Sequence, residues 1–144
     1  MKYLIVTAIT SAFLLANVKA DVEAVNVVKN SDRYSFSVKL HSTETGCKQY
    51  ANWWEVLNSK GELLYRRILF HSHPNDQPFT RSGGSIKLDK NETIYIRAHM
   101  NNVGYVGDIF VGTVASGFKK ATKLPTFNNK KLESTKPLPD GCAF

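Results

Sequence analysis

The sequence is short of the features that define several common protein classes. Among its 144 residues there are two cysteines and two methionines, and only the N-terminus carries a long apolar run. There is no glycine-rich phosphate loop that opens a helix, no His-Glu-x-x-His motif and no Gly-x-Ser-x-Gly elbow. These absences argue against a nucleotide-binding enzyme, a zinc protease and a serine hydrolase. No catalytic residue is predicted, and a non-enzymatic role is favoured over an enzymatic one.

The apolar run at the N-terminus has the layout of a secretory signal peptide. Lys2 gives a positive start, residues 3–16 are almost entirely apolar, and Val18-Lys19-Ala20 has the small-x-small pattern of a cleavage site. The run is short for a membrane span, and no second one follows. We therefore predict a signal peptide over residues 1–20 with cleavage after Ala20. The mature chain is expected to be secreted or periplasmic, with no transmembrane segment.

The positive charge is concentrated at the C-terminal end. The whole chain has a formal net charge of +7, but from residue 117 onward six lysines face two acids, and residues 21–116 are close to neutral. A nucleic-acid partner is not predicted, because arginines and aromatics are not interleaved on one folded face. A solubilising tail is favoured over contact with an anionic surface.

Cys47 and Cys142 are the only cysteines, and an exported chain folds in an oxidising compartment. We predict that they form a disulfide that ties the tail to the body. Free thiols and an intermolecular bridge are the alternatives.

Short alternating segments indicate strands along most of the mature chain. Residues 34–41 alternate apolar and polar side chains, and so do residues 93–100, where Tyr95, Arg97 and His99 are expected to face outward. Residues 51–57 and 62–71 flank a short loop with a glycine and indicate a hairpin, with a helix over residues 62–70 as the competing interpretation. Further strands are expected at residues 22–28, 85–88 and 108–114. The pattern predicts an all-β, immunoglobulin-like sandwich over residues 21–116, followed by an irregular basic tail over residues 117–144.

The stretch from Leu69 to Gly84 holds the sharpest chemical signal. His71 and His73 are two apart, so in a strand they would point to one face and could converge on a metal ion. His99 and Asp76 are the candidates to complete such a site, and Cu or Zn would suit these ligands. The competing interpretation is that the histidines only hydrogen-bond the loop.

A second group of residues in and around this stretch suggests ligand binding. Arg81 and Ser82, followed by two glycines, could present a guanidinium and backbone N–H groups to an anion. Trp53 and the adjacent Trp54, with Tyr50 and Tyr65, could form an aromatic platform. Packing and local ion pairing are the alternatives for both groups.

Several motifs together resemble a family of small exported bacterial proteins. They are Tyr50-Ala51-Asn52-x-Trp54-x-Val56, Gly61-Glu62-x-Leu64, Arg67-x-Leu69-x-His71-x-His73, Gln77-Pro78-Phe79-Thr80-Arg81-Ser82 and Gly104-Tyr105-x-Gly107. Members of that family tend to have Asp at the position of Asn52 and Trp near the position of Cys47. The resemblance implies a location in the bacterial envelope and brings no activity with it.

These observations lead to two functional hypotheses. The first is an exported, non-enzymatic binding module whose working surface is the segment from His71 to Gly84, facing a ligand or a partner in the envelope. The second is a periplasmic copper- or zinc-binding protein that uses His71 and His73.

Overall fold

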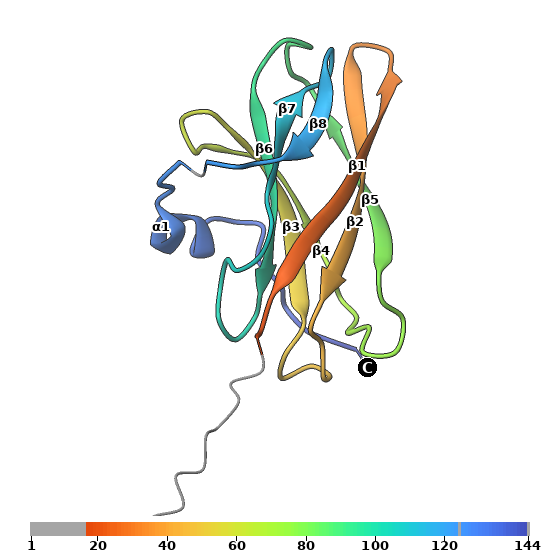
Figure 1. The fold of residues 1–144 in the computed structure, drawn as a ribbon, viewed down its shortest axis with the longest axis vertical. Coiled ribbons are helices and arrows are strands. Elements are labelled where there is room, and N and C mark those ends of the chain that lie inside the picture. Colours follow the sequence, from red (N-terminus) through yellow and green to blue (C-terminus); the bar gives the residue numbers. More distant parts are fainter. Residues whose placement is uncertain (1–16, 124, 144) are drawn as a thin grey trace, which may run out of the picture.

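The computed structural model describes residues 17–123 and 125–143, and they form two antiparallel sheets packed face to face (Figure 1). The smaller sheet has the order β1-β2-β5, with β1 at Ala20–Asn30, β2 at Arg33–Ser42 and β5 at Phe79–Ile86. The larger sheet has the order β4-β3-β6-β7-β8. Its strands are β4 (Leu63–Ile68), β3 (Ala51–Asn58), β6 (Ile94–Met100), β7 (Phe110–Thr113) and β8 (Gly117–Lys120). One short helix, α1 (Asn129–Glu133), follows them. The predicted all-β sandwich is confirmed, while its immunoglobulin-like type stays a prediction.

The core lies between the two sheets and follows directly from the alternation in the sequence. In β2, Tyr34, Phe36, Val38 and Leu40 are buried, and the residues between them are exposed or half-buried. Trp54 and Val56 of β3 face them from the other sheet, together with Ile94 and Ile96 of β6. An alternating strand covers one face with apolar side chains, so two such sheets bury them against each other.

The predicted hairpin of residues 51–71 is present as β3 and β4, but β4 ends at Ile68. His71 and His73 therefore lie in the connection after the strand instead of on one strand face. The next strand also begins earlier than the sequence suggests. Phe79 pairs with Leu40 as the first residue of β5, inside the stretch expected to be a loop, and its side chain is buried in the core. The ladder with β2 determines where β5 starts, and this long-range pairing leaves no local signal in the sequence.

The outer face of the larger sheet is covered, so Arg97 and His99 point outward as expected but are not exposed to solvent. Both side chains point away from the core, yet they are only 2% and 6% exposed. The C-terminal segment crosses this face, with α1 on the side of the sheet opposite to β1 and β2 (Figure 1). Leu132 of α1 is 4% exposed, so the helix packs through this side chain, while its other four residues are exposed. Residues 117–144 thus contain a paired strand and a docked helix where the sequence suggests an irregular tail.

The predicted disulfide is present and fixes the end of this segment. Cys47 and Cys142 are joined with their Cα atoms 5.8 Å apart, across 95 residues of sequence. Next to the bridge, His71 pairs with Ala143 in a short parallel contact. The C-terminal segment is therefore held at both ends, by β8 and by the disulfide.

Of the predicted signal peptide, residues 1–20, the first sixteen lie outside the described residues. Ala20, the residue before the predicted cleavage point, is the first residue of β1. In the part of the chain that the structure describes, no helix is long and apolar enough to cross a membrane.

Candidate functional site

A cluster of charged side chains lies beneath the C-terminal segment on the outer face of the larger sheet. Glu55 of β3 stands opposite Arg66 of β4 and Arg97 of β6 in the strand register, so all three point to the same side. Arg66 donates to Glu55 Oε2 from Nη2 at 2.7 Å and from Nε at 3.0 Å. Arg97 Nε donates to Glu55 Oε1 at 2.9 Å. Two buried arginines share one buried carboxylate, which leaves the cluster with a net positive charge.

Arg66 also anchors the covering segment. Its Nη1 donates to the carbonyl oxygens of Thr135 and Pro137 at 2.5 and 3.0 Å, and Nη2 donates to that of Leu132 at 2.8 Å. These bonds satisfy carbonyl groups at and beyond the end of α1, which have no partner within the helix. The covering segment is thus held by Arg66 as well as by the disulfide.

His99 lies next to this cluster in a stack of aromatic rings. Its ring is parallel to that of Trp53, with the centroids 3.7 Å apart, and Nδ1 lies 2.7 Å from Asn52 Oδ1. Nε2 lies 3.2 Å from Glu133 Oε1 on α1. Burial lowers the pKa of His99 to about 4, so the ring is neutral at pH 7. Burial also raises the pKa of Tyr105, whose phenol stays neutral.

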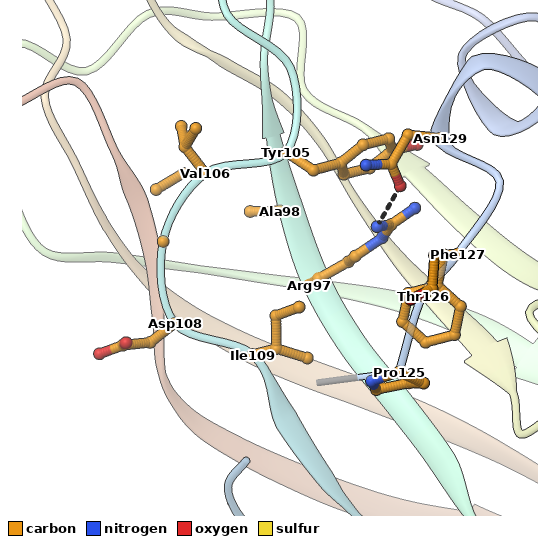
Figure 2. A pocket seen from close by; sticks show the side chains of 12 residues that line it. Arg97, Ala98, Tyr105, Val106, Asp108, Ile109, Pro125, Thr126, Phe127 and Asn129 are labelled. Carbon is orange, nitrogen blue, oxygen red and sulfur yellow. Dashed lines mark hydrogen bonds between the residues drawn. The ribbon is translucent and has the colours of Figure 1, made fainter. Parts of the chain in front are cut away.

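A cavity of about 210 Å³ opens beside Arg97 (Figure 2). It lies where β6 loses its partner, since β7 pairs with β6 only as far as Ile96. The loop that includes Tyr105, Val106 and Ile109 forms one side, and the segment from Pro125 to Asn129 forms the other. The cavity is therefore walled partly by the sandwich and partly by the segment that covers it.

Arg97 is the only buried cation among the described residues that line this cavity. Its guanidinium carbon lies 3.4 Å from the ring centroid of Tyr105 and 5.0 Å from that of Phe127. Nη1 donates to Asn129 Oδ1 at 2.8 Å, whereas Nη2 is buried and has no hydrogen-bond partner within the described chain. A buried donor without an acceptor costs free energy, but Nη2 is covered by protein atoms, so the cavity meets the charge of Arg97 and not this donor.

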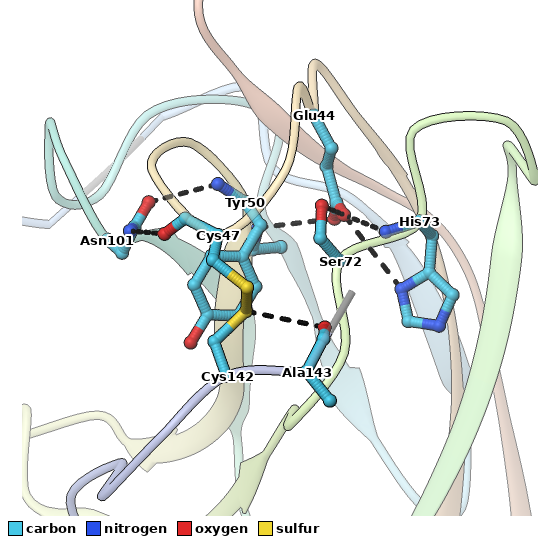
Figure 3. The surroundings of a disulfide bond; sticks show 9 residues. Glu44, Cys47, Tyr50, Ser72, His73, Asn101, Cys142 and Ala143 are labelled. Atoms are coloured by element: carbon cyan, nitrogen blue, oxygen red, sulfur yellow. Dashed lines mark hydrogen bonds and ion pairs between the residues drawn. A yellow bond between two sulfur atoms is a disulfide. The ribbon is translucent and has the colours of Figure 1, made fainter.

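The predicted site around His71 and His73 is organised by a buried acid, Glu44. Its Oε1 accepts from Ser42 Oγ at 2.7 Å and from the Ala51 N–H at 3.2 Å. Its Oε2 accepts from Ser72 Oγ at 3.1 Å and from the backbone N–H of His73 (Figure 3). Glu44 therefore ties the end of β2, the start of β3 and the histidine segment together.

His73 is held on its other side by two residues of β5. Its ring stacks on Phe79 with the centroids 4.1 Å apart, and Arg81 Nη2 donates to Nε2 at 2.6 Å. Burial, and then the charge of Arg81, lowers the pKa of His73. The neutral ring carries its proton on Nδ1, 3.9 Å from Glu44 Oε2. These contacts match the alternative interpretation, in which His73 and Arg81 stabilise the loop.

The remaining predicted site residues are spread over the molecule. His71 and Asp76 are exposed, while His99 contacts Asn52 and Glu133 on the covered face. Within residues 17–123 and 125–143, no group of three or more His, Cys, Asp and Glu side chains is arranged to hold a metal ion. The Cu or Zn hypothesis therefore stays a prediction, without a third ligand to support it.

The predicted ligand-binding residues are not brought together either. Ser82 pairs with Ser37 through their hydroxyl groups at 2.5 Å. Trp53 lies on the covered face under Arg66, whereas Tyr65 packs against Trp54 and the core on the opposite face. The two rings therefore do not form one platform.

Sequence reasoning missed Glu55, Arg66, Arg97 and Tyr105. The available signal was a charge on an otherwise apolar strand face, since Arg66 interrupts the series Leu64, Ile68 and Phe70. Glu55 likewise stands in the middle of an apolar strand. Unpaired charges are rare on buried strands, so such interruptions predict a buried partner of opposite charge.

Comparison with known proteins finds sequence similarity to a curated protein. The chain is 37% identical over 89 residues to a protein of Halomicrobium mukohataei that carries the name "Putative lipoprotein". The match covers 61% of this chain and 43% of that protein, so the chain spans less than half of its relative's length. No protein-family profile and no solved structure matches the chain.

Proposed function

We propose that the protein is an exported, non-enzymatic β-sandwich that binds a small ligand in the cavity beside Arg97. One observation carries the proposal: the cavity of about 210 Å³ is lined by a buried arginine that belongs to a cluster with a net positive charge. Binding pockets are concave, mostly apolar and furnished with a few placed polar groups. The apolar side chains of Val106, Ile109 and Phe127 beside one guanidinium fit that description.

Export is supported by the N-terminal sequence pattern, the disulfide and the name of the relative. Disulfides persist in oxidising compartments, and this one holds the segment that walls the cavity. If the full chain is expressed with residues 1–20 intact, we expect a mature protein outside the cytoplasm whose N-terminal residue is Asp21. N-terminal sequencing of the exported protein checks both points.

The segment from His71 to Gly84 is the second candidate surface for the same binding function. A shallow hollow of about 350 Å³ is lined by residues 72–76, and the neighbouring Phe70 side chain is 47% exposed. Arg81 and His73 are already engaged with each other, so this surface would offer mainly exposed side chains to a partner. His71→Ala tests this surface, because His71 is exposed and does not line the cavity. The substitution should weaken binding to this surface and leave binding in the cavity unchanged.

The cavity is tested by blocking it at its rim. Thr126 is exposed and lines the cavity, so Thr126→Trp would fill part of it with little disturbance of the core. Thr122→Trp, at an exposed residue outside the lining, is the matched control. Ligand-observed NMR with four-carbon alcohol, amide, amine and carboxylate probes should show at least one class that binds the wild type and the control but not Thr126→Trp. Binding of none of the four classes, or equal binding by Thr126→Trp, would contradict the proposed function.

A further inference from the structure

The charge balance around the cavity indicates which class of ligand it takes. We propose that the cavity binds a small monocarboxylate, whose charge balances that of the buried cluster of Arg66, Glu55 and Arg97. The inference rests on the proposed function and adds the chemistry of the ligand.

The buried groups around the cavity carry one uncompensated positive charge. Glu55 is shared by Arg66 and Arg97, and the side chains of all three are at most 3% exposed. The other hydrogen-bond acceptor of the Arg97 guanidinium is the side chain of Asn129, which carries no charge. Asp108 also lines the cavity, but its carboxylate pairs with Lys120 at 2.6 Å and points away from Arg97 (Figure 2). One ligand carboxylate would neutralise the cluster, whereas a dianion would leave a buried negative charge.

The hydrogen-bond donors around the cavity also favour a ligand that carries a hydrogen-bond acceptor. A guanidinium presents only N–H groups, and its planar fork matches a carboxylate. The edge of β6 at Ala98 adds backbone groups. The backbone of Met100 hydrogen-bonds with that of Gly104 at the β7 edge of β6. Because bonding alternates along an antiparallel strand, the N–H and C=O of Ala98 point to the same edge. They lie beyond Ile96, the last residue of β6 that pairs with β7. A ligand that accepts at one end and packs at the other would satisfy this arrangement.

The walls limit the remainder of the ligand to a short apolar group. Tyr105 and Phe127 lie on the guanidinium, and Ala20, Val106, Ile109 and Pro125 add apolar side chains to the lining. A volume of about 210 Å³ is below the range of about 300–1,000 Å³ typical for drug-sized ligands. A carboxylate with a chain of a few carbon atoms fits such a space.

The test uses the full chain with its disulfide intact, because Ala20 lines the cavity, and two probes with the same carbon chain, one an anionic carboxylate and the other a neutral amide. Sodium butyrate and butyramide are titrated by calorimetry into the wild type, Arg97→Gln and Arg33→Gln. Arg33 is an exposed arginine on β2, so its replacement removes the same charge far from the cavity. We expect butyrate to bind at least about tenfold more tightly than butyramide, and Arg97→Gln to weaken butyrate by about 10- to 100-fold. Arg33→Gln should leave both affinities within about twofold.

A second variant keeps the test decisive if Arg97→Gln fails to fold. Asn129 is exposed, so Asn129→Asp places a carboxylate against Arg97 Nη1 without opening the core. The variant should weaken butyrate by about tenfold or more and leave butyramide unchanged. Equal affinity of the wild type for the two probes, or unchanged butyrate binding by both variants, overturns the carboxylate assignment. Binding of an alcohol, amide or amine that Thr126→Trp abolishes would leave the proposed function standing, whereas absence of all probe binding removes both.

Discussion

Arg66 donates two hydrogen bonds to one carboxylate oxygen of Glu55, at 2.7 and 3.0 Å, and neither side chain is exposed to solvent. The pair lies on a sheet face that would be open to water without the C-terminal segment. A buried ion pair is strongly destabilised when one member is removed, because the other charge stays buried and unpaired. Glu55 is the critical member of this cluster, since it is the acid shared by two arginines.

We therefore expect Glu55→Gln to lower the free energy of unfolding by about 3–5 kcal/mol. Urea denaturation followed by circular dichroism measures the change. The matched control is Glu23→Gln on β1, whose ion pair with Lys39 is partly exposed and should contribute less than about 1 kcal/mol. A loss of less than 1 kcal/mol for Glu55→Gln would show that the cluster is not a paired, buried unit.

Removal of the disulfide should loosen the covering segment before it unfolds the sandwich. In the loop-closure picture, a bridge across 95 residues contributes on the order of 4 kcal/mol. We expect a Cys47→Ser, Cys142→Ser double variant to lose stability of that order and to expose the backbone amides of residues 125–143 to hydrogen exchange. The wild type under oxidising conditions is the reference. Equal exchange of this segment in both proteins would mean that Arg66 and Leu132 hold it without the bridge.

The neutral, buried His99 predicts a loss of stability in mild acid. The folded-state pKa of His99 is lowered from 6.5 to about 4, so the unfolded chain binds a proton more tightly between these values. Stability should fall as the pH decreases from about 6.5 to about 4, by up to about 3 kcal/mol from this group. Thermal unfolding of the wild type and His99→Gln over this range checks the prediction. The variant should lose less stability than the wild type, and parallel curves would contradict the assignment.

His71 and His73 should behave differently on mutation, because the structure gives them different surroundings. His73 stacks on Phe79 and accepts from Arg81, so His73→Ala should cost about 1–3 kcal/mol. His71 is exposed, and His71→Ala should change stability by less than about 0.5 kcal/mol. Unfolding with and without added Cu(II) or Zn(II) separates this from metal binding. Metal-dependent stabilisation of the wild type that either variant abolishes would favour the metal hypothesis.

The sequence predicted what depends on local alternation and missed what depends on the fold's long-range contacts. The strand of residues 34–41 was predictable because each apolar residue faces one core, and the disulfide was predictable because two cysteines leave one intramolecular pairing. The burial of Arg97 and His99 was not predictable, since it depends on a C-terminal segment whose composition reads as irregular. Leu132 is the one buried apolar residue of α1, too little for a helical pattern.

The candidate site likewise combines residues that the sequence pointed to and residues that it did not. The sequence drew attention to His71, His73 and Arg81 because their residue types are chemically distinctive. The structure engages His73 with Arg81 and Glu44 and brings Arg97, Tyr105 and Phe127 together from three separate parts of the chain. The sequence shows no spacing pattern for residues that only the fold brings together, so their contact is seen only in the structure.

The most direct test of the account is a crystal structure of the full chain soaked with butyrate. The account predicts electron density for the probe in the cavity, with the carboxylate toward Arg97 and the chain against Phe127 and Ile109. A cavity that holds only water at a butyrate concentration that saturates the calorimetric titration, or a probe bound elsewhere, would contradict it.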